Sequence, residues 1–318
     1  MEWAIYTSSR KKNKMTASVL FEEWYYILML GTVLALSYQA RKYDIFQPLY
    51  SFVAKKVKSK RAVIALTSAI SGVLPINGRV VISAGVLNTL APVEGDERRK
   101  KYGVIDYLAT HHFYFWSPLE KTVILPMAAL NISYWSFFGS TWPLLATVVA
   151  CTLWYIFGKI KEEDVEINIR SKREIQKLDT KAIVKDNIIT LLIVTGLLMA
   201  GNIVGYYKDS IANLIGNSHT SDVLILTLIG SFVLSFILGS SGKFAGVLGV
   251  ILPIFGQMYL PLLFAVNWAG YILSPMHKCM IIGKRIFGSD FKDYYRVLIG
   301  VVTAVVAVGL IHTYTTGL

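Results

Sequence analysis

Two short segments of the sequence share four residues at the same spacing, and both lie inside apolar runs. The first reads Tyr114-Phe115-Trp116-Ser117-Pro118-Leu119-Glu120-Lys121, and the second reads Tyr271-Ile272-Leu273-Ser274-Pro275-Met276-His277-Lys278. Tyrosine, serine, proline and lysine recur in both. An ionisable side chain at membrane depth is costly unless it has a partner or a water-filled cavity. The duplication therefore predicts a two-fold transporter core.

Four basic residues fall outside the loops and form two pairs. They are Arg79 and Lys243, at breaks in long apolar runs, and Lys121 and Lys278, at the ends of the two motifs. Glu120 is the one carboxylate clearly at comparable depth, because Asp106 is expected near the cytoplasmic end of its helix. The site would then carry an excess of about three positive charges, and helix N-termini at the breaks also favour anions. We predict an anion site. The alternative is that these side chains reach the interface or pair with Glu120 and backbone carbonyls.

Polar and titratable residues accompany these charges. Ser71, Asn77, Ser240 and Ser241 lie in the breaks, where hydroxyls and unwound carbonyls can bind a substrate or sodium, or simply satisfy freed backbone groups. Glu120 and His277 occupy equivalent motif positions and could carry a coupled proton or act as internal counter-ions, with Ser117 and Ser274 beside them. For His111, packing in the helix bundle is the favoured interpretation.

Composition indicates an all-α polytopic membrane protein. Of 318 residues, 54% are hydrophobic and 16% are charged, against about 25% charged in an ordinary soluble domain. The net charge of +12 would raise nucleic acid as a partner of a soluble chain. Here most of the charge lies in loops between apolar segments, as the positive-inside rule predicts. The expected surroundings are a lipid bilayer, with no nucleic acid.

No pattern typical of a soluble enzyme is present. The sequence has no Gly-rich phosphate loop followed by Lys-Ser/Thr and no nucleophile elbow. Cys151 and Cys279 both fall within apolar segments. We interpret them as packing residues, because two cysteines are too few for a metal site and no His/Cys cluster has metal-ligand spacing. We expect no enzyme activity and no cofactor, apart from Na⁺ or H⁺ as a coupling ion.

The apolar runs divide the chain into two halves with the same order of elements. The first half, 19–158, contains spans over 19–40, 103–130 and 141–159 and a re-entrant hairpin over about 61–92. The second half, 187–318, contains spans over 187–206, 259–282 and 297–314 and a hairpin over about 223–256. Glycine and proline interrupt the hairpins at 71–79 and 238–243. Pro118 and Pro275 are expected to break the spans that carry them.

Three full spans in each half predict an inverted repeat, with about six full transmembrane helices and two re-entrant hairpins. Basic residues concentrate in four loops, which we predict to be cytoplasmic, in the inner membrane of a prokaryote: 41–61, 93–103, 159–186 and 283–296. The intervening segments 131–140 and 207–222 hold a single lysine. The basic N-terminal tail, 1–18, is an exception, because the same topology places it outside.

The residues at the breaks resemble those of the ion transporter superfamily of secondary carriers, which contains citrate, dicarboxylate and gluconate permeases. The similarity rests on Gly72-Val73-Leu74-Pro75 and Ser83-Ala84 in the first half, and on Leu238-Gly239-Ser240-Ser241-Gly242 and Gly270 to His277 in the second. Within that superfamily the sequence is most similar to an uncharacterised prokaryotic integral membrane family. The resemblance spans roughly 60–315. It implies an inverted repeat with two opposed hairpins, often dimeric, that moves as an elevator or rocking body.

Three functions remain open from the sequence. The favoured one is a proton- or sodium-coupled secondary transporter of a small organic or inorganic anion. The second is a non-transporting subunit that keeps the carrier fold and acts as a scaffold or anchor in a larger membrane complex. The third is a membrane-embedded enzyme acting on a lipid or an anionic headgroup, for which no paired nucleophile and base are found.

Overall fold

The computed structural model describes residues 55–73, 79–90, 97–165 and 220–316, with isolated residues between 28 and 53 and between 184 and 207. The regular elements in this part of the chain are all helical, as predicted. The N-terminal tail, the bulk of the predicted spans over 19–40 and 187–206, and most of the charged linker lie outside the described residues.

Two helix pairs stand where the hairpins were predicted. α4 (Lys60–Val73) packs against α5 (Arg79–Leu90), and α11 (Thr220–Leu238) packs against α12 (Ser241–Phe255). The break before α12 is short because Gly239 has a φ of +53°, a conformation that glycine adopts without steric cost. The predicted interruption at 238–243 is confirmed, whereas residues 74–78 of the first one lie outside the described residues.

The helices that carry the repeated motif are also interrupted. α6 (Arg98–Thr110) is followed by a short 3₁₀ turn, η1 (His112–Phe115), and five residues separate this turn from α7 (Lys121–Leu130). In the second copy, α13 (Leu260–Leu273) ends at the motif and α14 (Lys278–Phe287) follows it. Proline has no amide hydrogen and clashes with the preceding turn, so each break falls at the motif proline. The predicted breaks are confirmed, and 103–130 and 259–282 are each two short helices.

Two boundaries predicted from the sequence are wrong. The segment 131–140, predicted to be a loop, is mostly helical, because α8 begins at Tyr134. α8 spans Tyr134–Leu153 and continues as a π turn, η2 (Trp154–Lys159). Ser133 caps α8 by accepting a hydrogen bond from the Ser136 amide at 3.2 Å, which lets the helix start early. The supposed loop 283–296 is also largely helical, because α14 runs to Phe287 and α15 spans Phe291–Thr316.

Two helices in the described part of the chain are long and apolar enough to cross a membrane, Tyr134–Lys159 and Phe291–Thr316. In their most apolar windows only 28% and 33% of the residues are buried, so most of this apolar surface faces outward. α11 likewise exposes large apolar side chains, including Leu226 and Ile237. Apolar surface of this extent is typical of a protein surrounded by lipid or by a partner.

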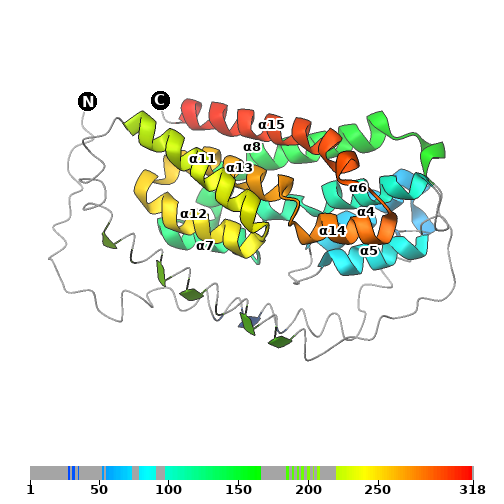
Figure 1. The fold of residues 1–318 in the computed structure, drawn as a ribbon, viewed down its shortest axis with the longest axis horizontal. Helices are drawn as coiled ribbons and strands as arrows, with labels where there is room; N and C mark the ends of the chain where they lie inside the picture. Colours follow the sequence, from blue (N-terminus) through cyan, green and yellow to red (C-terminus); the bar gives the residue numbers. More distant parts are fainter. Residues whose placement is uncertain are drawn as a thin grey trace.

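The two halves of the chain exchange the helices that follow their motif breaks, α7 and α14. Figure 1 shows α11, α12, α13 and α7 on one side and α4, α5, α6 and α14 on the other, with α8 and α15 running alongside both groups. Corresponding pairs pack in each group: α4 on α6 and α11 on α13, then α5 on α14 and α12 on α7. Each group therefore takes its fourth helix from the other half of the chain.

The four predicted cytoplasmic loops meet at one end of the molecule. Arg61 forms an ion pair with Glu162 at 2.8 Å, and Lys101 pairs with Asp164 at 2.7 Å. Arg99 donates a hydrogen bond to the Ile286 carbonyl at 2.9 Å. This contact joins the second predicted loop, 93–103, to the fourth, 283–296. These contacts join described residues of all four segments, and the side of a membrane on which they lie stays a prediction. At the opposite end, Gln257 donates to the Ser136 hydroxyl at 2.7 Å.

Candidate functional site at the paired helix breaks

The two copies of the motif meet in the interior of the protein. The phenol oxygens of Tyr114 and Tyr271, the first residues of the two copies, lie 2.6 Å apart and share a hydrogen bond. Both side chains are buried. The Phe244 ring, from α12, stacks on Tyr271 and meets Tyr114 edge-on. The duplicated residues therefore form one site, to which both halves contribute.

The end of α4 and the residue after α11 reach these breaks. A Cβ added at Gly72 would lie 2.8 Å from the Thr110 carbonyl oxygen, at the end of α6. A Cβ added at Gly239 would lie 2.7 Å from Ser274 Oγ, in the second motif. Approaches this close leave no room for a side chain. Gly72 and Gly239 are therefore held against the interrupted helices.

Four helices begin at the breaks, and each has a basic residue in its first turn. These residues are Arg79 in α5, Lys121 in α7, Lys243 in α12 and Lys278 in α14. Lys121 is half-buried and Lys278 is exposed, whereas the side chains of Arg79 and Lys243 lie outside the described part of the structure. Each helix N-terminus carries a partial positive charge of about half a unit from its unpaired amides. The region is therefore suited to an anion.

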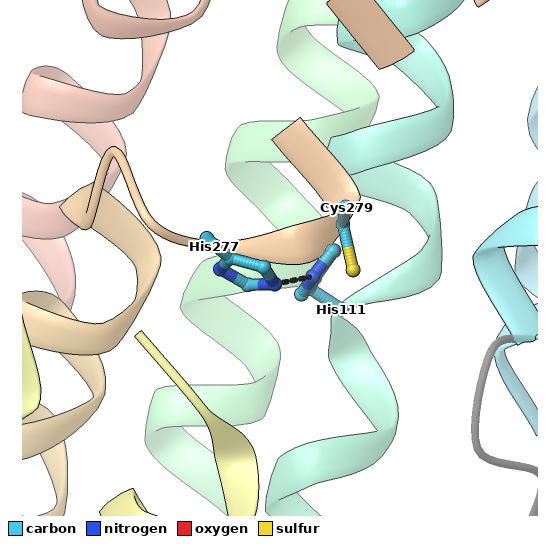
Figure 2. A group of neighbouring side chains, drawn as sticks. All are labelled: His111, His277 and Cys279. Carbon is cyan, nitrogen blue, oxygen red and sulfur yellow. Dashed lines mark hydrogen bonds between the residues drawn. The ribbon is translucent and has the colours of Figure 1, made fainter. Parts of the chain in front are cut away.

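A histidine pair lies beside the tyrosines. His111 follows α6, and His277 immediately precedes α14. Their Nε2 atoms are 3.2 Å apart, and Figure 2 shows the two rings meeting edge-on with Cys279 alongside. The Sγ of Cys279 and one nitrogen of each histidine lie within 4.8 Å of one another. Both histidines are buried, and the cysteine is partly exposed.

Tyr107, one helical turn before His111, connects this pair to the backbone of the second half. Its hydroxyl donates to the Ile272 carbonyl at 2.7 Å and lies 2.8 Å from His277 Nδ1. The carbonyl oxygen of the same tyrosine is hydrogen-bonded to His111 Nδ1. Tyr107 therefore holds both rings in position.

The predicted polar residues have more ordinary surroundings. Ser71 is buried and donates to the Thr67 carbonyl at 2.8 Å, and Ser274 accepts from the Met276 amide at 3.2 Å. Ser117 is buried in the first motif. Ser240 and Ser241 lie at the start of α12, partly buried. Asn77 lies outside the described residues.

Two buried carboxyl groups lie near the breaks. Glu120, in extended backbone at the N-cap of α7, is buried as predicted. Asp106 is also buried, and it accepts a hydrogen bond from the Ser83 hydroxyl of α5. The sequence placed Asp106 near the start of its helix, but α6 runs from Arg98 to Thr110, so Asp106 lies in the second half of the helix. It is therefore a second acid close to the site.

The sequence did not identify Tyr107, His111 and Cys279 as site residues. Tyr107 and His111 could have been grouped from the sequence, because residues four apart on a helix lie on the same face. No local signal was available for their meeting with His277, since 166 positions separate the two histidines. The absence of close His/Cys spacing therefore did not exclude a cluster.

Residues 24–217 match the model of a family described as "Protein of unknown function (DUF401)". The match covers more than half of the 318 residues, so the chain belongs to this family. No curated protein matches the sequence.

Proposed function

We propose that this member of the DUF401 family is a secondary active transporter of a small anion. The observation that carries the proposal is the 2.6 Å contact between Tyr114 and Tyr271. It joins two interrupted helices that carry the same motif, with a hairpin tip against each of them. Carriers built from repeats place their substrate site at such paired, discontinuous helices, near the middle of the membrane.

An inverted repeat accounts for the arrangement of the helices. The order of hairpin, broken helix and long helix is the same in both halves, and corresponding pairs of helices pack together. The exchange of α7 and α14 between the two groups is what a two-fold axis through the tyrosine contact would produce (Figure 1). In this proposal, alternating access takes place around the two hairpin tips.

The charge balance favours an anionic substrate. Four helices begin at the breaks, each with a basic residue in its first turn. Among the described residues, Glu120 and Asp106 are buried acids near the breaks. Backbone amides at a helix N-terminus bind carboxylate, phosphate or sulfate oxygens directly. In this scheme the negative charge of the substrate would be neutralised by Arg79, Lys121, Lys243 and Lys278. The hydroxyl groups of Ser240 and Ser241 would donate hydrogen bonds to it.

Glu120 is the proposed site for the coupling ion. It is a buried carboxyl group between Ser117 and the start of α7, where it could take up a proton or help to bind sodium. The ends of α6 and α13 face the same region, and their terminal carbonyls are ligands that sodium prefers. His277 is less suited to this role, because its ring already contacts Tyr107 and His111.

Uptake into proteoliposomes tests the proposal. The panel consists of radiolabelled phosphate, sulfate, succinate and citrate, each with an imposed proton or sodium gradient. We expect gradient-dependent uptake of at least one of them. Replacing Lys121 or Lys278 with Met should reduce it about tenfold or more, because a charged hydrogen bond contributes about 1.5–3 kcal/mol.

Lys292→Met is the matched control. Lys292 is an exposed lysine in the first turn of α15, at the charged end of the molecule, and its loss should leave uptake unchanged. If folded K121M and K278M proteins transport as well as K292M, the two lysines have no part in binding. If no panel anion is taken up and none raises the unfolding temperature, the anion proposal fails and the scaffold alternative gains support.

A further inference from the structure

We infer that His111, His277 and Cys279 form a binding site for a borderline-soft metal ion of the Zn²⁺ class. The three side chains come from both halves of the chain and lie together at the breaks (Figure 2). The inference goes beyond the proposed function and does not depend on it, because metal binding can be measured on purified protein without any transport assay.

The hydrogen bonds of His277 are compatible with a hydrogen on Nδ1. The Tyr107 hydroxyl lies 2.7 Å from the Ile272 carbonyl and 2.8 Å from His277 Nδ1. When it donates to the carbonyl, the tyrosine oxygen accepts from Nδ1. The Tyr271 carbonyl, 3.2 Å from Nδ1, can only accept. With the hydrogen on Nδ1, the neutral ring has its lone pair on Nε2.

His111 has the same tautomer. Its Nδ1 is hydrogen-bonded to the Tyr107 carbonyl, which can only accept. The second neighbour of Nδ1 is the Thr110 hydroxyl at 3.1 Å, and this group donates its own proton to the Asp106 carbonyl at 2.6 Å. Nδ1 therefore carries the hydrogen here too, and the neutral His111 ring also presents its lone pair on Nε2.

The two Nε2 atoms lie on the neighbouring edges of the rings. They are 3.2 Å apart, a separation that a shared proton or a shared metal ion can bridge. Two imidazoles bound to one tetrahedral zinc at about 2.0–2.1 Å have nitrogens about 3.3–3.4 Å apart. An Nδ1–H donated to a backbone carbonyl is also the usual way in which proteins orient a metal-binding histidine. Spacing and orientation both fit a shared metal ion.

Cys279 supplies the third ligand and the selectivity. Its Sγ lies within 4.8 Å of the two histidine nitrogens, and a tetrahedral zinc needs about 3.5 Å, so the sulfur has to approach by about 1 Å. Cys279 lies in the first turn of α14. A thiolate with two imidazoles selects Zn²⁺ or Cu⁺ over Mg²⁺ and Ca²⁺, which prefer oxygen ligands. Three protein ligands leave the fourth position for water or an anion.

Cobalt binding tests the site directly. Full-length protein in detergent, prepared without a histidine tag and stripped with a chelator, is titrated with Co²⁺. We expect one Co²⁺ per chain, with the strong visible bands of tetrahedral cobalt and the near-ultraviolet band of a cobalt–thiolate bond. An equimolar amount of Zn²⁺ should abolish both. A protein that develops neither band refutes the site, as it would if the two histidines only shared a proton.

The second cysteine provides a matched control. Cys151, partly exposed in α8, is not a member of the cluster, so Cys151→Ser should keep the cobalt–thiolate band. Cys279→Ser should lose it, and a folded C279S protein that retains the band overturns the proposal. If C279S does not fold, maleimide labelling of the unmodified protein tests the same point. Zn²⁺ should slow maleimide labelling of Cys279 about tenfold or more and leave Cys151 unchanged, because a metal-bound thiolate is a poor nucleophile. Equal effects on both cysteines refute it.

Discussion

Removing the hydroxyl of Tyr114 should destabilise the protein, and removing that of Tyr271 as well should restore part of the loss. The two oxygens lie 2.6 Å apart between buried rings. Tyr114→Phe leaves the Tyr271 hydroxyl without this hydrogen bond, and a buried polar group that loses its hydrogen bond costs about 1–3 kcal/mol. Replacing both partners by apolar groups of the same shape is nearly neutral.

The ring contacts are unchanged in these variants, which makes the comparison specific for the hydroxyl groups. Phe at position 271 keeps the stacking of Tyr271 on Phe244 and on His277. The double variant Y114F/Y271F should therefore be more stable than Y114F by about 1 kcal/mol.

Equilibrium unfolding in mixed micelles with increasing SDS, followed by tryptophan fluorescence, measures these free energies. Two additive losses, with the double variant less stable than Y114F, would show that the hydroxyl groups do not interact and that the two motifs are not joined as described.

Two further predictions concern the packing of α11 on α13 and the charged end of the molecule. Gly270→Ala should destabilise by about 1–3 kcal/mol, because its new Cβ would lie 2.3 Å from the Phe232 carbonyl oxygen; Gly139→Ala, with nothing within 4 Å, should be neutral or stabilising by up to about 1 kcal/mol, in the same unfolding assay. The hydrogen bond from Lys101, with a further one from the Lys161 amide, lowers the pKa of Asp164 below its usual 3.8. Since a lowered folded pKa gives stability that is present above the unfolded value and lost as pH falls through the folded one, the unfolding temperature should drop below about pH 4. The Asp164→Asn variant should lose that part of the pH dependence, and an unchanged profile in D164N would contradict the assignment.

The class of the protein and the positions of its helix breaks could be predicted from the sequence, because both follow from local chemistry. Long apolar runs determine the need for a nonpolar environment. Pro118 and Pro275 remove backbone hydrogen bonds, and Gly239 permits a positive φ, wherever the rest of the chain lies. The helix boundaries were less accurate, since a cap such as Ser133 extends α8 into an expected loop.

The partners in the site could not be predicted in this way. The duplicated motif indicated that two segments are related, and the prediction that both lie in one interior site rested on that symmetry. Which side chains touch is decided by how α6, α13 and α14 pack, because side-chain contacts depend on the rotation and depth of each helix. His111 is an example. The residues next to it in the sequence indicated only a side chain packed in the helix bundle, and not its contact with His277.

The sequence alone therefore determined a helical, strongly apolar protein with two broken motif helices, because hydrophobicity, proline and glycine act on the residues that carry them. Only the tertiary structure decided that His111, His277 and Cys279 come together and that Tyr114 bonds Tyr271. Those contacts join residues more than 150 positions apart, and no local pattern specifies which faces of distant helices will meet.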